Sequence, residues 1–172
     1  MVDYQSLSIV LTGLGIMGAI IYYTLTLRNA NRTQRTQLFM HLFEQLNTEE
    51  SMISIAELIN QEIGDYDDFI LKYDSSVNPE HYAKRFNIWQ KYHQIGELLR
   101  MGIIDPELVH RLQMAPVVIA MWEKWGDIIR EVRERENAPE IVEGFEYLYY
   151  ELKRLRREKG YGEYRYPFPN RQ

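Results

Sequence analysis

The chain has 172 residues, of which 45% are hydrophobic and 26% are charged. This composition suits one packed domain with a short additional segment and excludes a wholly disordered chain. The absence of cysteine excludes disulfides, cysteine nucleophiles and thiolate metal sites, and the net charge of −5 argues against a general nucleic-acid-binding protein.

The first predicted element is residues 7–27, an uncharged run of 21 residues. At about 1.5 Å per residue, a helix of this length spans roughly 30 Å, the hydrocarbon thickness of a bilayer. A cleaved signal peptide would need a basic segment before a shorter apolar run, but the only charged side chain before residue 7 is Asp3. We therefore predict an uncleaved transmembrane helix after a short external N-terminus, residues 1–6.

One face of the predicted span carries only small or hydroxyl-bearing residues. At alternating steps of four and three, its members are Ser8, Thr12, Gly15, Ala19, Tyr22 and Thr26. Helices in lipid associate through close packing across small residues, because lipid removes the hydrophobic drive between them. We interpret this stripe as a helix-packing face for a second copy of the chain or another membrane subunit. The alternative is a chance pattern of lipid-facing residues.

Three arginines, Arg28, Arg32 and Arg35, follow the span, and no acidic residue occurs before Glu44. Basic residues beside a span remain in the cytoplasm. They predict a single-pass protein of the cell membrane with its N-terminus outside and its C-terminal domain in the cytoplasm. The lipid bilayer is its expected environment.

Residues 28–160 are predicted to form a cytosolic helical bundle. Helix start signals occur at Asn47, Asn78, Asp105 and Ala115. Gly102 and Gly160 follow apolar helical runs and are typical stop signals. Because no stretch alternates with a period of two, the predicted fold class is all-α: one N-terminal transmembrane helix followed by a cytosolic helical bundle.

The helix predicted over residues 79–101 has the widest apolar face and is expected to be central in the bundle. Trp89, Tyr92 and Ile95 belong to this face. Gly96 lies among them, although an interior glycine costs about 1 kcal/mol of helix propensity. We therefore expect a close crossing with another helix at Gly96.

The sequence offers few groupings with chemical potential. Glu107-x-x-His110 matches one element of a carboxylate-bridged di-metal bundle, but a second copy is missing and an acid is expected in the first turn of a helix. His93 and Glu97 form an i,i+4 pair, which is more often structural than catalytic. Trp89, Trp122 and Trp125 fit core positions better than a ligand-stacking site. We expect no catalytic residues, no metal and no cofactor.

Charge is segregated along the chain. Residues 44–70 hold eight carboxylates and no Lys or Arg, whereas residues 153–159 hold five basic residues and one Glu. The basic end fits a solvated helix C-terminus better than a membrane-surface patch or a contact with the acidic segment of a neighbouring subunit. Residues 161–172 form an aromatic and Pro-containing tail, which is either a docking peptide or disordered.

The chain resembles a known family at several short stretches that follow the span and its three arginines in the sequence. These are Ile95-Gly96-Glu97-Leu98-Leu99, Gly102-Ile103-Ile104-Asp105, Trp122 and Ile128-Ile129-Arg130. The stretches resemble an uncharacterised prokaryotic family of small single-pass membrane proteins with a cytosolic helical domain of unknown function. The similarity covers roughly residues 5–155. It implies a fold and a topology but no activity.

Three classes of function remain compatible with the sequence. A membrane-anchored interaction protein (a scaffold, adaptor or accessory subunit of a membrane complex) is favoured, because packing surfaces are abundant and no catalytic grouping is evident. A membrane-tethered enzyme or small-ligand sensor would use a pocket in the bundle with His93, Glu97 or His110. A defence or toxin-like effector would act at the membrane.

Overall fold

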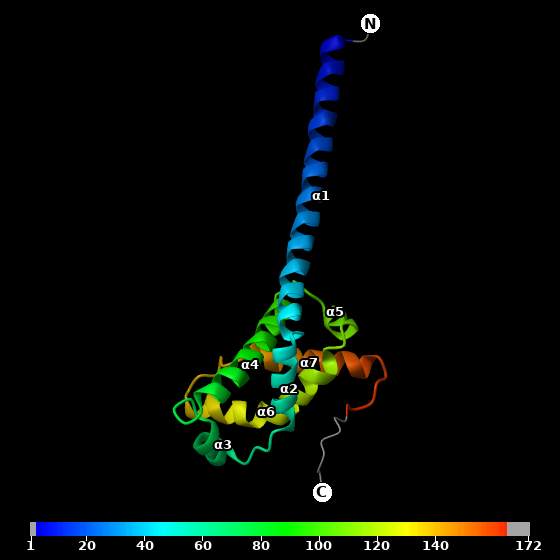
Figure 1. Cartoon of the computed structure of the whole chain (residues 1–172). Coiled ribbons are helices and arrows are strands. Elements are labelled where there is room, and N and C mark those ends of the chain that lie inside the picture. Colours follow the sequence, from blue (N-terminus) through cyan, green and yellow to red (C-terminus); the bar gives the residue numbers. More distant parts are fainter. Residues whose placement is uncertain (1–2, 165–172) are drawn as a thin grey trace. The chain divides into compact units, whose positions relative to one another are not determined.

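The computed structural model describes residues 3–164, apart from the side chains of residues 4–7, 10 and 32 (Figure 1). Its helices are α1 (Tyr4–Leu46), α2 (Glu49–Asn60), α3 (Tyr66–Tyr73), α4 (Pro79–Arg100), α5 (Pro106–Arg111), α6 (Ala115–Arg135) and α7 (Glu143–Glu158). No strand occurs among the described residues, which confirms the all-α class. The chain divides into two compact units, Met1–Leu38 and Phe39–Gln172.

The first unit is helical from Tyr4 onward, and α1 continues without a break beyond the predicted 7–27. Every described side chain from residue 8 to residue 38 is exposed. The second unit begins with the last two turns of α1, where Phe39, Leu42 and Leu46 are buried.

The core of the second unit is built from α2, α4, α6 and α7. The helix α4 packs most extensively on α7 and also contacts α2 and α3, while α6 contacts α2, α3 and α7. Aromatic rings fill the centre: Trp89 meets Trp125 edge-on at 5.4 Å, and Trp122 meets Phe145 edge-on at 4.9 Å. The central position predicted for α4 and the core positions predicted for the three tryptophans are confirmed.

Most predicted helix boundaries are confirmed by their capping contacts. The Asn78 side chain accepts a hydrogen bond from the His81 backbone N–H at 3.0 Å, and Asp105 accepts one from that of Leu108 at 2.7 Å. Gly102 and Gly160 adopt φ values of +65° and +73°, the left-handed conformation that ends a helix at little cost in glycine.

One boundary and one helix differ from the prediction. The N-cap of α2 is Thr48, whose hydroxyl accepts from the Ser51 backbone N–H at 3.2 Å. Asn47 is not the cap, because its side chain donates to the carbonyl of Phe43 at 2.8 Å and so completes the end of α1. The helix α3 was not predicted; its eight residues are too short for a periodic apolar signal, and only the Asp65 cap marks its start.

The helices α4 and α7 cross with their backbones in direct contact. A Cβ atom built on Gly96 would lie 1.7 Å from the carbonyl oxygen of Gly144, and one built on Gly144 would lie 2.4 Å from the carbonyl oxygen of His93. Real Cβ atoms essentially never approach other atoms this closely. The close crossing predicted at Gly96 is therefore confirmed, and its partner is Gly144.

Gly96→Ala should lower the free energy of unfolding by about 2 kcal/mol. Overpacking against a backbone costs up to roughly 3 kcal/mol, of which ~1 kcal/mol is recovered through the higher helix propensity of alanine. The measurement is denaturant unfolding of the full chain in detergent, monitored by circular dichroism. Gly162→Ala is the matched control, since its Cβ would have no neighbour within 4 Å. Equal stability of Gly96→Ala and the parent would contradict a backbone contact at this crossing.

Candidate functional site

The helix α1 presents a long apolar surface. The segment Leu11–Leu46 contains an 18-residue window with a mean hydropathy of 1.2, and the helix is long and apolar enough to cross a membrane. Buried core helices and signal sequences share this length and composition, but none of this apolar window is buried against the described residues. The exposed fraction of its large apolar side chains ranges from 45% at Leu27 to 73% at Tyr22.

The six residues of the predicted packing stripe, from Ser8 to Thr26, are all exposed on α1. The hydroxyl of Thr12 donates to the carbonyl of Ser8 at 2.9 Å, and that of Thr26 donates to the carbonyl of Tyr22 at 2.9 Å. These two hydroxyl protons are therefore satisfied within the helix. A Cβ on Gly15 would have nothing within 4 Å, so the centre of the stripe is open in the single chain.

The arginines predicted to set the topology lie on α1 directly after the apolar run. Arg28 and Arg35 are exposed, and Arg32 shares their helix. No Asp or Glu occurs within four residues of any of the three.

The pair His93 and Glu97 lies at the N-terminus of α7. Val142, the N-cap of this helix, makes no side-chain capping bond. Instead, His93 on α4 accepts the Gly144 backbone N–H on Nδ1 at 2.9 Å. The carboxylate of Glu97 lies 3.3 Å from Arg100 on its own helix. His93 therefore caps a neighbouring helix. This hydrogen bond occupies the lone pair of Nδ1, which His93 would need to act as a base.

The pair Glu107 and His110 is likewise engaged in contacts within the domain. Glu107 pairs with Lys159 at 2.8 Å and with Arg111 at 3.0 Å, and hydrogen bonding to Lys159, followed by that to Arg111, lowers the pKa of its carboxyl. The ring of His110 lies 5.5 Å from that of Tyr161. Within residues 3–164, no group of three or more His, Cys, Asp or Glu residues is arranged to hold a metal ion.

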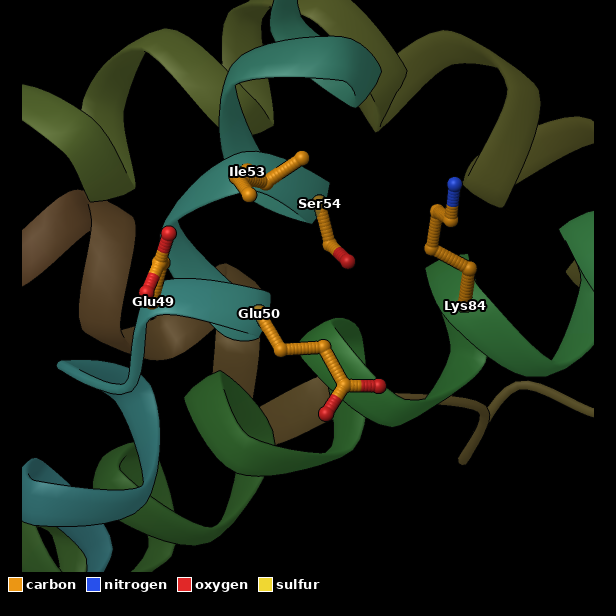
Figure 2. A pocket seen from close by; sticks show the side chains of 5 residues that line it. All are labelled: Glu49, Glu50, Ile53, Ser54 and Lys84. Carbon is orange, nitrogen blue, oxygen red and sulfur yellow. The ribbon is translucent and has the colours of Figure 1, made fainter.

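A shallow groove runs between α2 and α4 (Figure 2). One part, of ≈ 530 Å³, is lined by Glu49, Glu50, Ile53 and Ser54 on α2 and by Lys84 on α4. An adjoining part of ≈ 450 Å³ continues along α4 to Lys91. Figure 2 shows Glu50 and Lys84 on facing walls. The groove was not predicted. The signal available in the sequence was a segment rich in carboxylates and free of Lys and Arg, residues 44–70, followed by a helix that carries Lys84 and Lys91.

Lys91 and Ser51 meet at the inner end of this groove. The Lys91 ammonium donates to the Ser51 hydroxyl and to the Gln45 carbonyl, each at 3.1 Å, and the Ser51 hydroxyl donates to the same carbonyl at 2.8 Å. Burial lowers the pKa of Lys91, opposed by the charge of Glu50. A serine nucleophile requires a base that accepts its proton, whereas Lys91 donates here. The cluster instead satisfies an orphan carbonyl in the last turn of α1.

Arg85 is a buried cation on α4, with only 5% of its surface exposed. It donates to the Tyr73 carbonyl at 2.6 Å and to Nδ1 of His81 at 3.2 Å, and its guanidinium lies 4.7 Å from the ring centre of Phe69. Among the residues described, no carboxylate lies within ion-pair distance of it. Burial lowers its pKa to about 10, so it remains charged at neutral pH.

His81 uses both ring nitrogens beside this arginine. Its Nδ1 accepts from Arg85, and its Nε2–H therefore donates to Oε1 of Gln61 at 2.7 Å. Burial, together with the charge of Arg85, lowers the pKa of His81 to about 4. This cluster was not predicted, although Arg85 falls within the apolar arc of its helix, where a cation needs partners.

The basic end of α7 is largely paired within the second unit. Lys153 contacts Glu123 at 3.3 Å, Arg154 contacts Glu151, and Lys159 contacts Glu107 at 2.8 Å. These pairs compensate three of the five basic residues of this segment.

The first residues of the predicted tail pack on the domain itself. Arg156 donates to the Gly162 carbonyl at 3.1 Å, and its guanidinium lies 5.6 Å from the ring of Tyr161 and 5.7 Å from that of Tyr164. Residues 161–164 therefore dock within the chain. The rest of the tail, residues 165–172, lies outside the described residues.

Together, these features define an all-helical protein with one long, exposed apolar helix. Residues 9–152 match the family described as "Domain of unknown function (DUF4760)", and the chain therefore belongs to that family. The predicted resemblance to a domain of unknown function is confirmed over most of the chain. No curated protein and no solved structure matches it.

Stability should fall as the pH is lowered from about 6.5 to about 4 because of His81. Its pKa is about 4 in the folded chain and 6.5 for an ordinary histidine, so the unfolded chain binds the proton first and is favoured in this window. Urea unfolding of the full chain at several pH values measures the effect. His81→Asn should flatten the profile there, whereas His41→Asn, at an exposed position on α1, should not. Identical profiles for His81→Asn and the parent would contradict the assignment.

Proposed function

We propose that the protein is a membrane-anchored helical interaction protein that acts as a scaffold, adaptor or accessory subunit of a membrane complex. One observation carries the proposal: the uncharged run of α1 exposes all of its described large apolar side chains, while the second unit has a separate core of its own. Contiguous apolar surface of this extent is not left in water by soluble proteins.

Lipid is the covering that best fits this surface. The uncharged run of residues 7–27 is as long as the hydrocarbon layer is thick, and a helix satisfies its own backbone hydrogen bonds there. The three arginines that follow support an external N-terminus and a cytoplasmic second unit. The placement in a prokaryotic cell membrane rests on the family resemblance.

An interaction role is supported by what the polar side chains do. His93 caps α7, Glu107 pairs with Lys159, and Lys91 donates to a backbone carbonyl in the last turn of α1. These three groups are thus engaged in holding helices together. The partners that we propose are the lipid bilayer and further membrane helices, either from a second copy or from other subunits.

The anchor and its orientation are testable by cysteine labelling, because the natural chain has no cysteine. In whole cells, Val2→Cys should react with a membrane-impermeant thiol reagent, whereas Glu163→Cys should react only after lysis. The protein should also remain in the membrane pellet after alkaline carbonate extraction. Labelling of Glu163→Cys alone in intact cells would reverse the topology, and release by carbonate would contradict the anchor.

The packing stripe predicts an effect of Gly15→Ile on assembly. A large side chain at the centre of the stripe should separate the helix backbones and weaken association several-fold, while the second unit stays folded. Oligomer size and partner recovery in mild detergent measure the effect. Gly13→Ile is the matched control, since Gly13 lies off the stripe and is equally open. Unchanged assembly of Gly15→Ile would identify the stripe as lipid-facing sequence.

A further inference from the structure

Residues 28–38, which we name the stalk, carry basic charge without any acidic counterpart. The stalk continues α1 directly after the uncharged run, and its only charged residues are Arg28, Arg32 and Arg35. The nearest carboxylates in the sequence are those of Asp3 and Glu44. Helical ion pairs form between residues three or four apart, so the stalk helix cannot neutralise these arginines itself.

The basic side chains of the second unit behave differently. Many cations there are paired with carboxylates: Lys72 with Asp68, Lys84 with Glu57, Arg111 with Glu107, Arg130 with Asp127, and Arg135 with Glu131. Others, such as Arg85, Lys91 and Arg156, donate to backbone carbonyls of the domain. Arg28 and Arg35 have no such partner among the described residues and are exposed. The stalk is thus the described segment where basic residues follow one another along the sequence with no carboxylate nearby, and it lies directly beside the most apolar run.

The spacing places the three arginines on one side of the stalk. Steps of four and three residues keep them in one row, and the row extends roughly 10 Å along the helix axis. Like charges at this spacing repel one another and weaken the helix by a few tenths of a kcal/mol per pair, unless anions lie between them.

The direction of the helix also favours the membrane surface. Cα–Cβ bonds in an α-helix tilt toward the N-terminus, which for the stalk is the direction of the uncharged run. The headgroup layer extends about 5–8 Å beyond the hydrocarbon. Arginine side chains are long enough to reach back to that layer from a turn or two away.

We propose that Arg28, Arg32 and Arg35 form a binding site for anionic phospholipid headgroups. The guanidinium groups donate to phosphate oxygens, a geometry that suits arginine better than lysine. This inference rests on the proposed function, because it requires residues 7–27 to span the bilayer. A nucleic acid is a poor alternative for a chain with a net charge of −5.

The test uses the full chain in phosphatidylcholine vesicles that contain a small fraction of spin-labelled lipid. Electron spin resonance then gives the relative affinity of the protein for labelled phosphatidylglycerol over labelled phosphatidylcholine. The parent should prefer phosphatidylglycerol by at least roughly fivefold at low salt, and the preference should shrink in 1 M salt. The triple variant R28Q/R32Q/R35Q should show no preference.

The matched control is R111Q/R154Q/R157Q, which removes the same charge from exposed positions of the second unit and should keep the full preference. Equal preference of the parent and R28Q/R32Q/R35Q would overturn the inference alone, provided that both proteins float with the vesicles. Failure of the parent to float would overturn the proposed anchor and the inference with it. Loss of the preference in inorganic phosphate, but not in chloride of equal ionic strength, would assign the site to free phosphate and overturn the lipid assignment.

Discussion

The backbone contact between Gly96 on α4 and Gly144 on α7 is the constraint on which the second unit depends. Because neither residue has a Cβ atom, the two helices approach until backbone atoms touch. That approach brings His93 to the start of α7 and places the rings of Tyr92 and Phe145 5.0 Å apart. A larger residue at either glycine would separate the cap and the aromatic core together.

A second fixed point is the Gln45 carbonyl in the last turn of α1. Lys91 and Ser51 both donate to this oxygen, so α4 and α2 together hold the end of α1 against the domain core. At the N-terminus of α7, His93 likewise binds a backbone group, the N–H of Gly144. Lys91, Ser51 and His93 thus bind backbone groups at helix termini, where unpaired backbone groups are costly to bury.

Local signals in the sequence predicted the parts of the fold that local chemistry controls. Asn78 and Asp105 cap their helices through bonds that reach only three residues ahead, and the role of Gly96 follows from its place in one helix face. The choice of Thr48 over Asn47 is also local, but two polar residues side by side offer equivalent caps in the sequence. The partner of Gly96 and the contacts of Arg85 with Tyr73 and Phe69 depend on residues distant in the chain. The groove between α2 and α4 likewise exists only after the two helices pack.

The positions of the tryptophans make their fluorescence a probe of one part of the protein. Its three tryptophans, Trp89, Trp122 and Trp125, are all buried in the second unit, and none lies in Met1–Leu38. Tryptophan fluorescence, excited selectively over that of the tyrosines at positions 4, 22 and 23, therefore follows the folding of the helical domain and does not report on the apolar run. Emission in detergent, in vesicles and in the presence of partners can be compared directly, because a change in what surrounds α1 does not by itself alter the environment of an indole ring.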